Sequence, residues 1–169
     1  MKRSIAILAL ACAQVSTAWA DTSTDQTVPD VPALLFPLQF WSSVPDALLK
    51  RCEREYPDKL LQIRTGFMHW VAGRPDDLAG RVEAMHSLFA PRIAAARKQS
   101  MADYKRQIDE TVSKPFVDGM FGDFTPAETE EICTRLDLAL PRMLPDEFTR
   151  DELVPALEKL EDFRRRLAG

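Results

Sequence analysis

Residues 124–143 read FTPAETEEICTRLDLALPRM and contain the clearest helix start in the chain. Thr125 stands at the N-cap position, Pro126 suits the first helical turn, and Glu128 follows the cap by three residues, which together make a capping box. We therefore predict one helix over 124–143, with Cys133 beside its buried face. That face consists of apolar residues that recur at helical spacing: Ile132, Leu136, Ala139, Leu140 and Met143.

The first twenty residues have the parts of a secretory signal peptide. Two basic residues at positions 2–3 precede an apolar run over 5–13, and the sequence AWA at 18–20 offers small residues at both positions that a signal peptidase reads. The run is too short to cross a bilayer. We predict cleavage after Ala20, a periplasmic or secreted protein, and no stable membrane insertion. Acylation at Cys12 is the alternative for this segment.

Two of the three cysteines, Cys52 and Cys133, remain after this cleavage. An even number of cysteines in an oxidising compartment favours a disulfide between them. It would close a loop of about 80 residues, which in the chain-entropy model is worth roughly 4.5 kcal/mol. A redox-active or metal-binding thiol pair is the alternative, but the chain has no C-x-x-C spacing.

The mature chain has the size of one domain and is acidic. Removal of residues 1–20 leaves 149 of the 169 residues and takes away two basic residues and no acidic one, so the formal charge changes from −4 to −6. This balance argues against nucleic acid or anionic lipid as a partner and is compatible with a basic protein. Residues 21–30 are polar and predict a flexible leader, so 31–168 form the predicted helical domain.

Apolar spacing predicts helices through most of this domain. We expect them over about 43–56, 58–72, 75–90, 92–112, 124–143 and 150–167, with a loop at 115–123. No segment alternates as a strand does, so the fold class is all-α: a single-domain bundle of about five to six helices, stapled by one disulfide. The helix over 58–72 is apolar on much of its circumference and is expected to be the most buried.

Residues 31–41 read VPALLFPLQFW, and Pro32 and Pro37 oppose a long helix there. We predict a Pro-rich extended strap. If exposed, this strap and the loop around 116–124 would offer apolar anchors to a protein partner. If buried, both would complete the core. The candidate partner-binding residues are the large apolar side chains of the two segments: Leu35, Phe36, Phe40, Trp41, Phe116, Met120 and Phe121.

Few residues suggest catalysis or metal binding. His69 lies between apolar neighbours and is expected to be a hydrogen-bonded histidine in the core or at its boundary. Glu83 and His86 form one Glu-x-x-His step, whereas carboxylate-bridged di-metal sites need two. The chain has no nucleophile elbow, phosphate-binding loop or zinc spacing. We therefore predict no metal, no cofactor and no enzyme, with an enzyme of unrecognised type as one alternative.

Two segments share the pattern Phe-Thr-x-x-Glu, at 124–128 and 148–152. The pattern resembles the Leu-Thr-x-x-Gln motif of CpxP/Spy-type periplasmic chaperones, with Phe in place of Leu and Glu in place of Gln. This resemblance implies a helical periplasmic protein that holds unfolded clients or senses envelope stress.

Together these features favour an exported, non-enzymatic protein-binding module, such as an adaptor, inhibitor or chaperone-like protein, whose partner is another envelope protein. Nothing in the sequence determines the oligomeric state. A carrier of a small apolar ligand is the alternative from another class. Its cavity would lie between helices and be lined by large apolar side chains: Phe67, Trp70, Met85 and Phe89.

We expect protein recovered from the periplasm to begin at Asp21 and to contain no free thiol. Intact-mass measurement checks the cleavage site, and thiol titration without reductant checks the cysteines. The control is the same titration after reduction and denaturation, which should count two thiols. Two free thiols in the unreduced sample would contradict the prediction.

Overall fold

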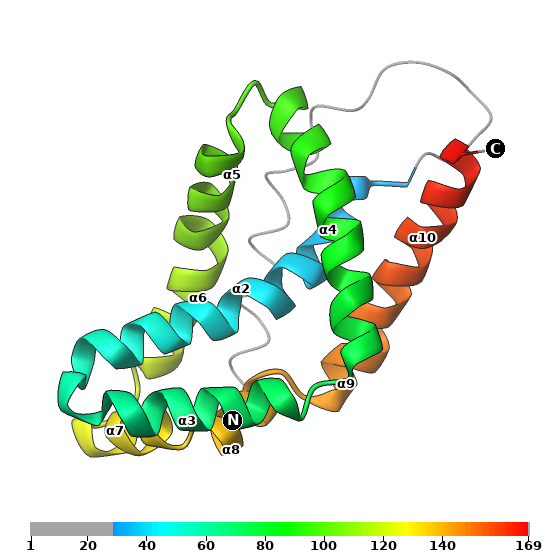
Figure 1. Cartoon of the computed structure of the whole chain (residues 1–169). Coiled ribbons are helices and arrows are strands. Elements are labelled where there is room, and N and C mark those ends of the chain that lie inside the picture. Colours follow the sequence, from blue (N-terminus) through cyan, green and yellow to red (C-terminus); the bar gives the residue numbers. More distant parts are fainter. Residues whose placement is uncertain (1–28, 169) are drawn as a thin grey trace.

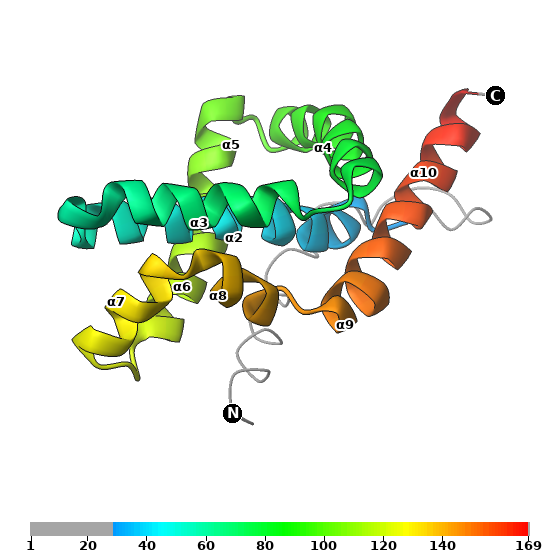
Figure 2. The same cartoon turned by 60° about the horizontal axis from the view of Figure 1, so that its bottom comes forward.

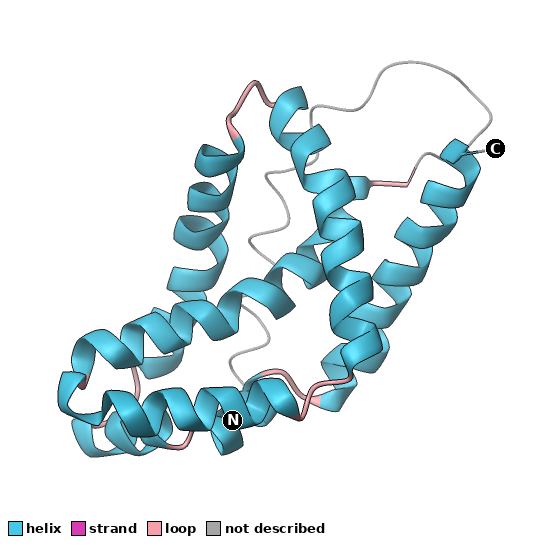
Figure 3. Cartoon of the chain, viewed as in Figure 1, coloured by secondary structure: helices cyan, strands magenta, loops and turns pink. Residues whose placement is uncertain are grey.

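The structure is a computed structural model that describes residues 29–168, apart from the side chain of Asp76. The predicted signal peptide, Cys12 and most of the predicted leader lie outside the described residues. Within 29–168 every regular element is helical, which confirms the all-α prediction (Figure 3). The α-helices are α2 (Val31–Glu55), α3 (Leu60–Ala72), α4 (Asp76–Ala96), α5 (Met101–Ile108), α6 (Lys114–Phe121), α7 (Pro126–Thr134), α8 (Leu136–Met143), α9 (Asp146–Phe148) and α10 (Val154–Ala168).

Some of these helices join end to end. A π-helical turn, Asp109–Ser113, connects α5 to α6, and a second one, Thr149–Leu153, connects α9 to α10. A short 3-10 turn, Pro57–Lys59, leads into α3. The described residues thus form seven helical runs, a little more than the five to six predicted.

Helix α2 runs through the middle of the molecule (Figure 1). Its first half contacts α4 and α10, and its second half lies beside α3 and α7. The turned view in Figure 2 shows α7 and α8 on the side of α3 away from α4 and α5. The core lies around α2, where five of its side chains are fully buried: Leu35, Leu38, Val44, Leu48 and Cys52.

The extended strap predicted for 31–41 is wrong, because these residues form the first turns of α2. Asp30 caps the helix by accepting a hydrogen bond from the Ala33 amide at 3.2 Å. Pro32 falls in the first turn, where a missing amide hydrogen costs nothing. Pro37 and Pro45 lie inside the helix and are themselves buried. Burial of the surrounding apolar side chains offsets the backbone hydrogen bonds that these prolines remove.

The predicted loop at 115–123 is also mostly helical. Residues 114–121 form α6, and Pro115 stands in its first turn. Burial of Val117 and Phe121 in the core stabilises this helix, although Gly119 in its middle disfavours helix formation. The local turn signals were therefore overridden by tertiary packing.

The two Phe-Thr-x-x-Glu segments behave differently. At the first, the capping box is confirmed: the Thr125 amide donates to Glu128 Oε2 at 2.8 Å, and the Glu128 amide donates to Thr125 Oγ1 at 3.3 Å. The helix that begins there ends early, because Arg135 leaves helical geometry (φ −125°, ψ 47°) and separates α7 from α8. The second segment starts no helix, since the run begins at Asp146 and Thr149 opens a π-helical turn.

The disulfide is confirmed. Cys52 of α2 and Cys133 of α7 are bonded, with their Cα atoms 5.2 Å apart, and both are fully buried. A second long-range link joins α4 to α10, where Arg81 Nε and Nη2 each donate to a carboxylate oxygen of Glu161 at 2.9 Å.

The turn after α3 is fastened to α2 by an aromatic stack. The guanidinium carbon of Arg74 lies 3.4 Å from the ring centre of Trp41 and 4.5 Å from that of Trp70. Burial between the rings lowers the pKa of Arg74 to about 10, and Asp46 opposes part of this shift.

None of the helices described in 29–168 has both the length and the apolar composition needed to cross a membrane.

Phe40→Ala should lower the free energy of unfolding by about 3–5 kcal/mol, because Phe40 is buried against the rings of Phe116 and Phe148. Urea denaturation followed by circular dichroism measures this. Leu167→Ala is the control, since Leu167 is exposed, and it should change the value by less than about 0.5 kcal/mol. Equal effects of the two variants would contradict the proposed core.

Candidate functional site

The residues predicted to bind a partner lie in the core or against it. Phe36, Phe116 and Met120 are half-buried against the core, and the other four are buried: Leu35, Phe40, Trp41 and Phe121. The two predicted binding segments pack on each other, since the Phe40 and Phe116 rings are 4.8 Å apart. These residues therefore belong to the core or to the layer packed against it.

The residues of the alternative ligand cavity lie as two pairs, one on α4 and one on α3. Met85 and Phe89 are buried in α4, and the Phe89 ring stacks on Phe163 of α10 at 6.0 Å. Phe67 and Trp70 are half-buried in α3 and contact each other, with ring centres 5.7 Å apart. None of these four side chains lines the cleft around His69 or the cleft around Arg51.

Helix α3 departs most from expectation. Predicted to be the most buried helix, it buries only Ile63 and Gly66. Leu61 and Met68 keep 83% and 60% of their surface exposed, which is unusual for large apolar side chains. With the exposed residues Thr65 and Ala72 they follow the spacing i, i+4, i+7, i+11, so all four lie along one face. We call this set, Leu61, Thr65, Met68 and Ala72, the α3 ridge.

The ridge faces solvent because α3 packs through its opposite side. There α3 contacts α2, α7 and, most extensively, α8. Gly66 allows the close approach to α8: a Cβ atom at this position would lie 3.3 Å from the backbone nitrogen of Leu136. The contact with α8 thus fixes which side of α3 is turned outward.

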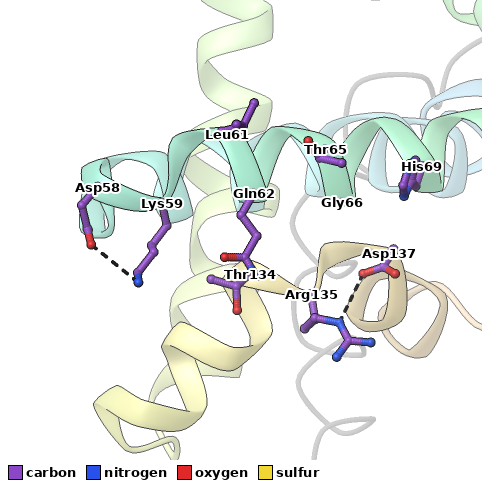
Figure 4. Close-up of a pocket in the computed structure, with 10 residues that line it drawn as sticks. All are labelled: Asp58, Lys59, Leu61, Gln62, Thr65, Gly66, His69, Thr134, Arg135 and Asp137. Atoms are coloured by element: carbon purple, nitrogen blue, oxygen red, sulfur yellow. Dashed lines mark ion pairs between the residues drawn. The ribbon is translucent and has the colours of Figure 1, made fainter.

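One edge of the ridge borders an open cleft of about 500 Å³ between α3 and the α7–α8 junction (Figure 4). Most of the residues that line it are polar or charged. Lys59 lies 3.9 Å from Asp58 and 3.7 Å from Glu130, and Arg135 lies 3.9 Å from Asp137. These long, exposed ion pairs are weak and leave their groups free to contact another molecule. The lining residues are Asp58, Lys59, Leu61, Gln62, Thr65, Gly66, His69, Thr134, Arg135 and Asp137.

His69 is exposed and lines this cleft. The sequence had instead suggested a place in the core or at its boundary. Thr65, Thr134 and Asp137 line the same cleft, so a histidine, two hydroxyls and an acid share one region (Figure 4). Among the hydrogen bonds found in residues 29–168, none involves the His69 ring, and the Thr134 hydroxyl donates to the Glu130 carbonyl at 2.8 Å. These contacts do not join His69 to a hydroxyl on one side and to an acid on the other, which is the arrangement that activates a nucleophile.

The other histidine lies on α4 and lines neither this cleft nor the one around Arg51. His86 is half-buried on α4, and burial lowers its pKa, while Glu83 raises it and Lys105 lowers it further. Glu83 Oε1 accepts a hydrogen bond from the Ser87 hydroxyl at 2.8 Å. Within the described residues we find no group of three or more histidine, cysteine or acidic side chains placed to hold a metal ion.

The α3 ridge and the cleft place exposed apolar side chains beside polar ones, an arrangement suited to non-covalent contact with another surface. The sequence contained a signal for this site, because Leu61 and Met68 form a second apolar stripe opposite the one assigned to the core. No family model, curated protein or solved structure compared with the chain matches it.

Gly66→Val should lower the free energy of unfolding by about 1–3 kcal/mol, because the added side chain meets the backbone of α8. Thermal and urea denaturation measure the change. Gly80→Ala is the matched control: it lies inside helix α4 with nothing within 4 Å of its added Cβ, so it should raise stability by about 0.5–1 kcal/mol. A tolerated Gly66→Val would show that α3 does not pack closely on α8.

Proposed function

We propose that the mature chain is an exported, non-enzymatic protein-binding module that presents the α3 ridge to another polypeptide chain. The observation that carries this proposal is the exposure of Leu61 and Met68 on a helix whose other side is packed. Large apolar side chains in water mark interaction surfaces when they lie together rather than singly.

Three features support a binding role for this face. The ridge is carried by a complete helix rather than a loop, so little conformational entropy is lost when a partner binds. Polar side chains of the adjoining cleft can form the rim that surrounds an apolar centre in protein interfaces. The Cys52–Cys133 disulfide joins α2 to α7, and this holds the cleft wall in place after export to an oxidising compartment.

The proposal differs from the sequence-based hypothesis in its surface, not in its class. That hypothesis assigned binding to segments 31–41 and 116–124, whose seven candidate residues are buried in the core or packed against it. In the present proposal the α3 ridge, not these segments, binds the partner. A ligand carrier lacks a specific observation in its favour, since its four lining residues line neither described cleft.

A photo-crosslinking amino acid placed at Leu61 or Met68 in the expressing cell should give covalent products with another polypeptide. The same amino acid at Leu167, which is also exposed but lies on α10, is the control and should give none. Mass spectrometry identifies the products. Equal products at all three positions, or none at positions 61 and 68, would contradict the proposal.

A further inference from the structure

The spacing of the α3 ridge is that of a coiled-coil seam. Steps of four, three and four residues from Leu61 to Ala72 match alternating d and a positions of a heptad, so a straight partner helix can lie along all four side chains. In residues 29–168 no other helix lies on this face, since the ridge residues are exposed. One partner helix can therefore cover the whole face.

The ridge is complementary to itself. In an antiparallel pair of α3 helices related by a two-fold axis between Gly66 and Phe67, Leu61 lies opposite Ala72 and Thr65 lies opposite Met68. Each level then pairs a large side chain with a small one, which fills the space between two helices evenly. A parallel pair would place Leu61 on Leu61 and Ala72 on Ala72, and would leave the small end poorly filled.

Electrostatics also permits this pairing. Four side chains of α3 flank the ridge, Gln62, Arg64, His69 and Val71, and only Arg64 is permanently charged. Its guanidinium is already bound by Glu53, with Nε 2.6 Å from the carboxylate. The adjoining cleft adds two cations, Lys59 and Arg135, and two anions, Asp58 and Asp137, whose charges cancel. An almost neutral strip is the part of an acidic chain where two copies repel each other least.

We propose that the α3 ridge pairs with the α3 ridge of a second copy of this chain, antiparallel and through a two-fold axis. This inference rests on the proposed function, because it names an occupant for the same face. The ridge spans eleven residue steps, about 16 Å. An interface of that length is small, so the dimer forms reversibly and depends on protein concentration.

The pairing geometry is tested with introduced cysteines. In the antiparallel pair, Leu61→Cys and Ala72→Cys face each other across the interface, and their separation of about 16 Å along one helix prevents a bond within a chain. The double variant should form a covalent dimer under mild oxidation at least about tenfold faster than either single variant. Cys52 and Cys133 are bonded to each other. The experiment uses the processed chain, from which Cys12 is removed with the predicted signal peptide.

Leu167→Cys on α10 is the matched control for random collisions and should crosslink as slowly as the single variants. Single variants as fast as the double variant would indicate another pairing and overturn the inference. So would failure of the double variant to exceed Leu167→Cys.

Sedimentation velocity over a concentration series gives an independent readout. The unaltered chain should associate as concentration rises, and Leu61→Glu with Met68→Glu should weaken association at least about tenfold while circular dichroism stays unchanged. Leu167→Glu should leave association unaltered. A chain that stays monomeric up to millimolar concentration overturns the inference.

The two proposals fail separately. If the purified chain stays monomeric while photo-crosslinks from positions 61 and 68 capture a different polypeptide, the dimer is wrong and the proposed function stands. If those crosslinks give a product of twice the chain mass, the second copy is the occupant. If neither crosslinks nor association occur, both proposals are wrong.

Discussion

Burial of helix α2 is the interaction on which the fold depends. Leu35, Leu38, Val44 and Leu48 have no exposed surface, and each contributes about 1.5–3 kcal/mol relative to an exposed side chain. Helices α4 and α10 cover the first half of α2, and α3 and α7 lie beside the second half. This burial keeps the prolines within α2 helical and gives the other helices a common surface on which to pack.

The two π-helical turns are part of the same packing. Both Asp109–Ser113 and Thr149–Leu153 contact α2. At the first, the buried Ser113 hydroxyl donates to the Ser43 hydroxyl at 2.8 Å, and Phe116 follows three residues later on the same face. A π turn adds one residue to a helical turn and so rotates the side chains that follow it. The widened turn lets one long run present a hydrogen-bonding group and an aromatic ring to α2.

Much of the fold could be predicted because its causes are local. The capping box at Thr125, the apolar spacing of most helices and the pairing of Cys52 with Cys133 follow from neighbouring residues or from simple counting. The candidate site could not be predicted in the same way. Apolar spacing shows that α3 has two apolar faces, but not which of them the rest of the chain will cover.

The sequence by itself determined an all-α chain with a disulfide between two distant helices, because helical periodicity and cysteine number do not depend on how the helices are arranged. Tertiary structure decided that 31–41 is helical and that Leu61 and Met68 face solvent. The reason is that burial is shared among distant segments. Other helices bury enough of the apolar surface of α2 to offset the backbone hydrogen bonds that its prolines remove. Close packing of Gly66 on α8 leaves the opposite face of α3 exposed to solvent.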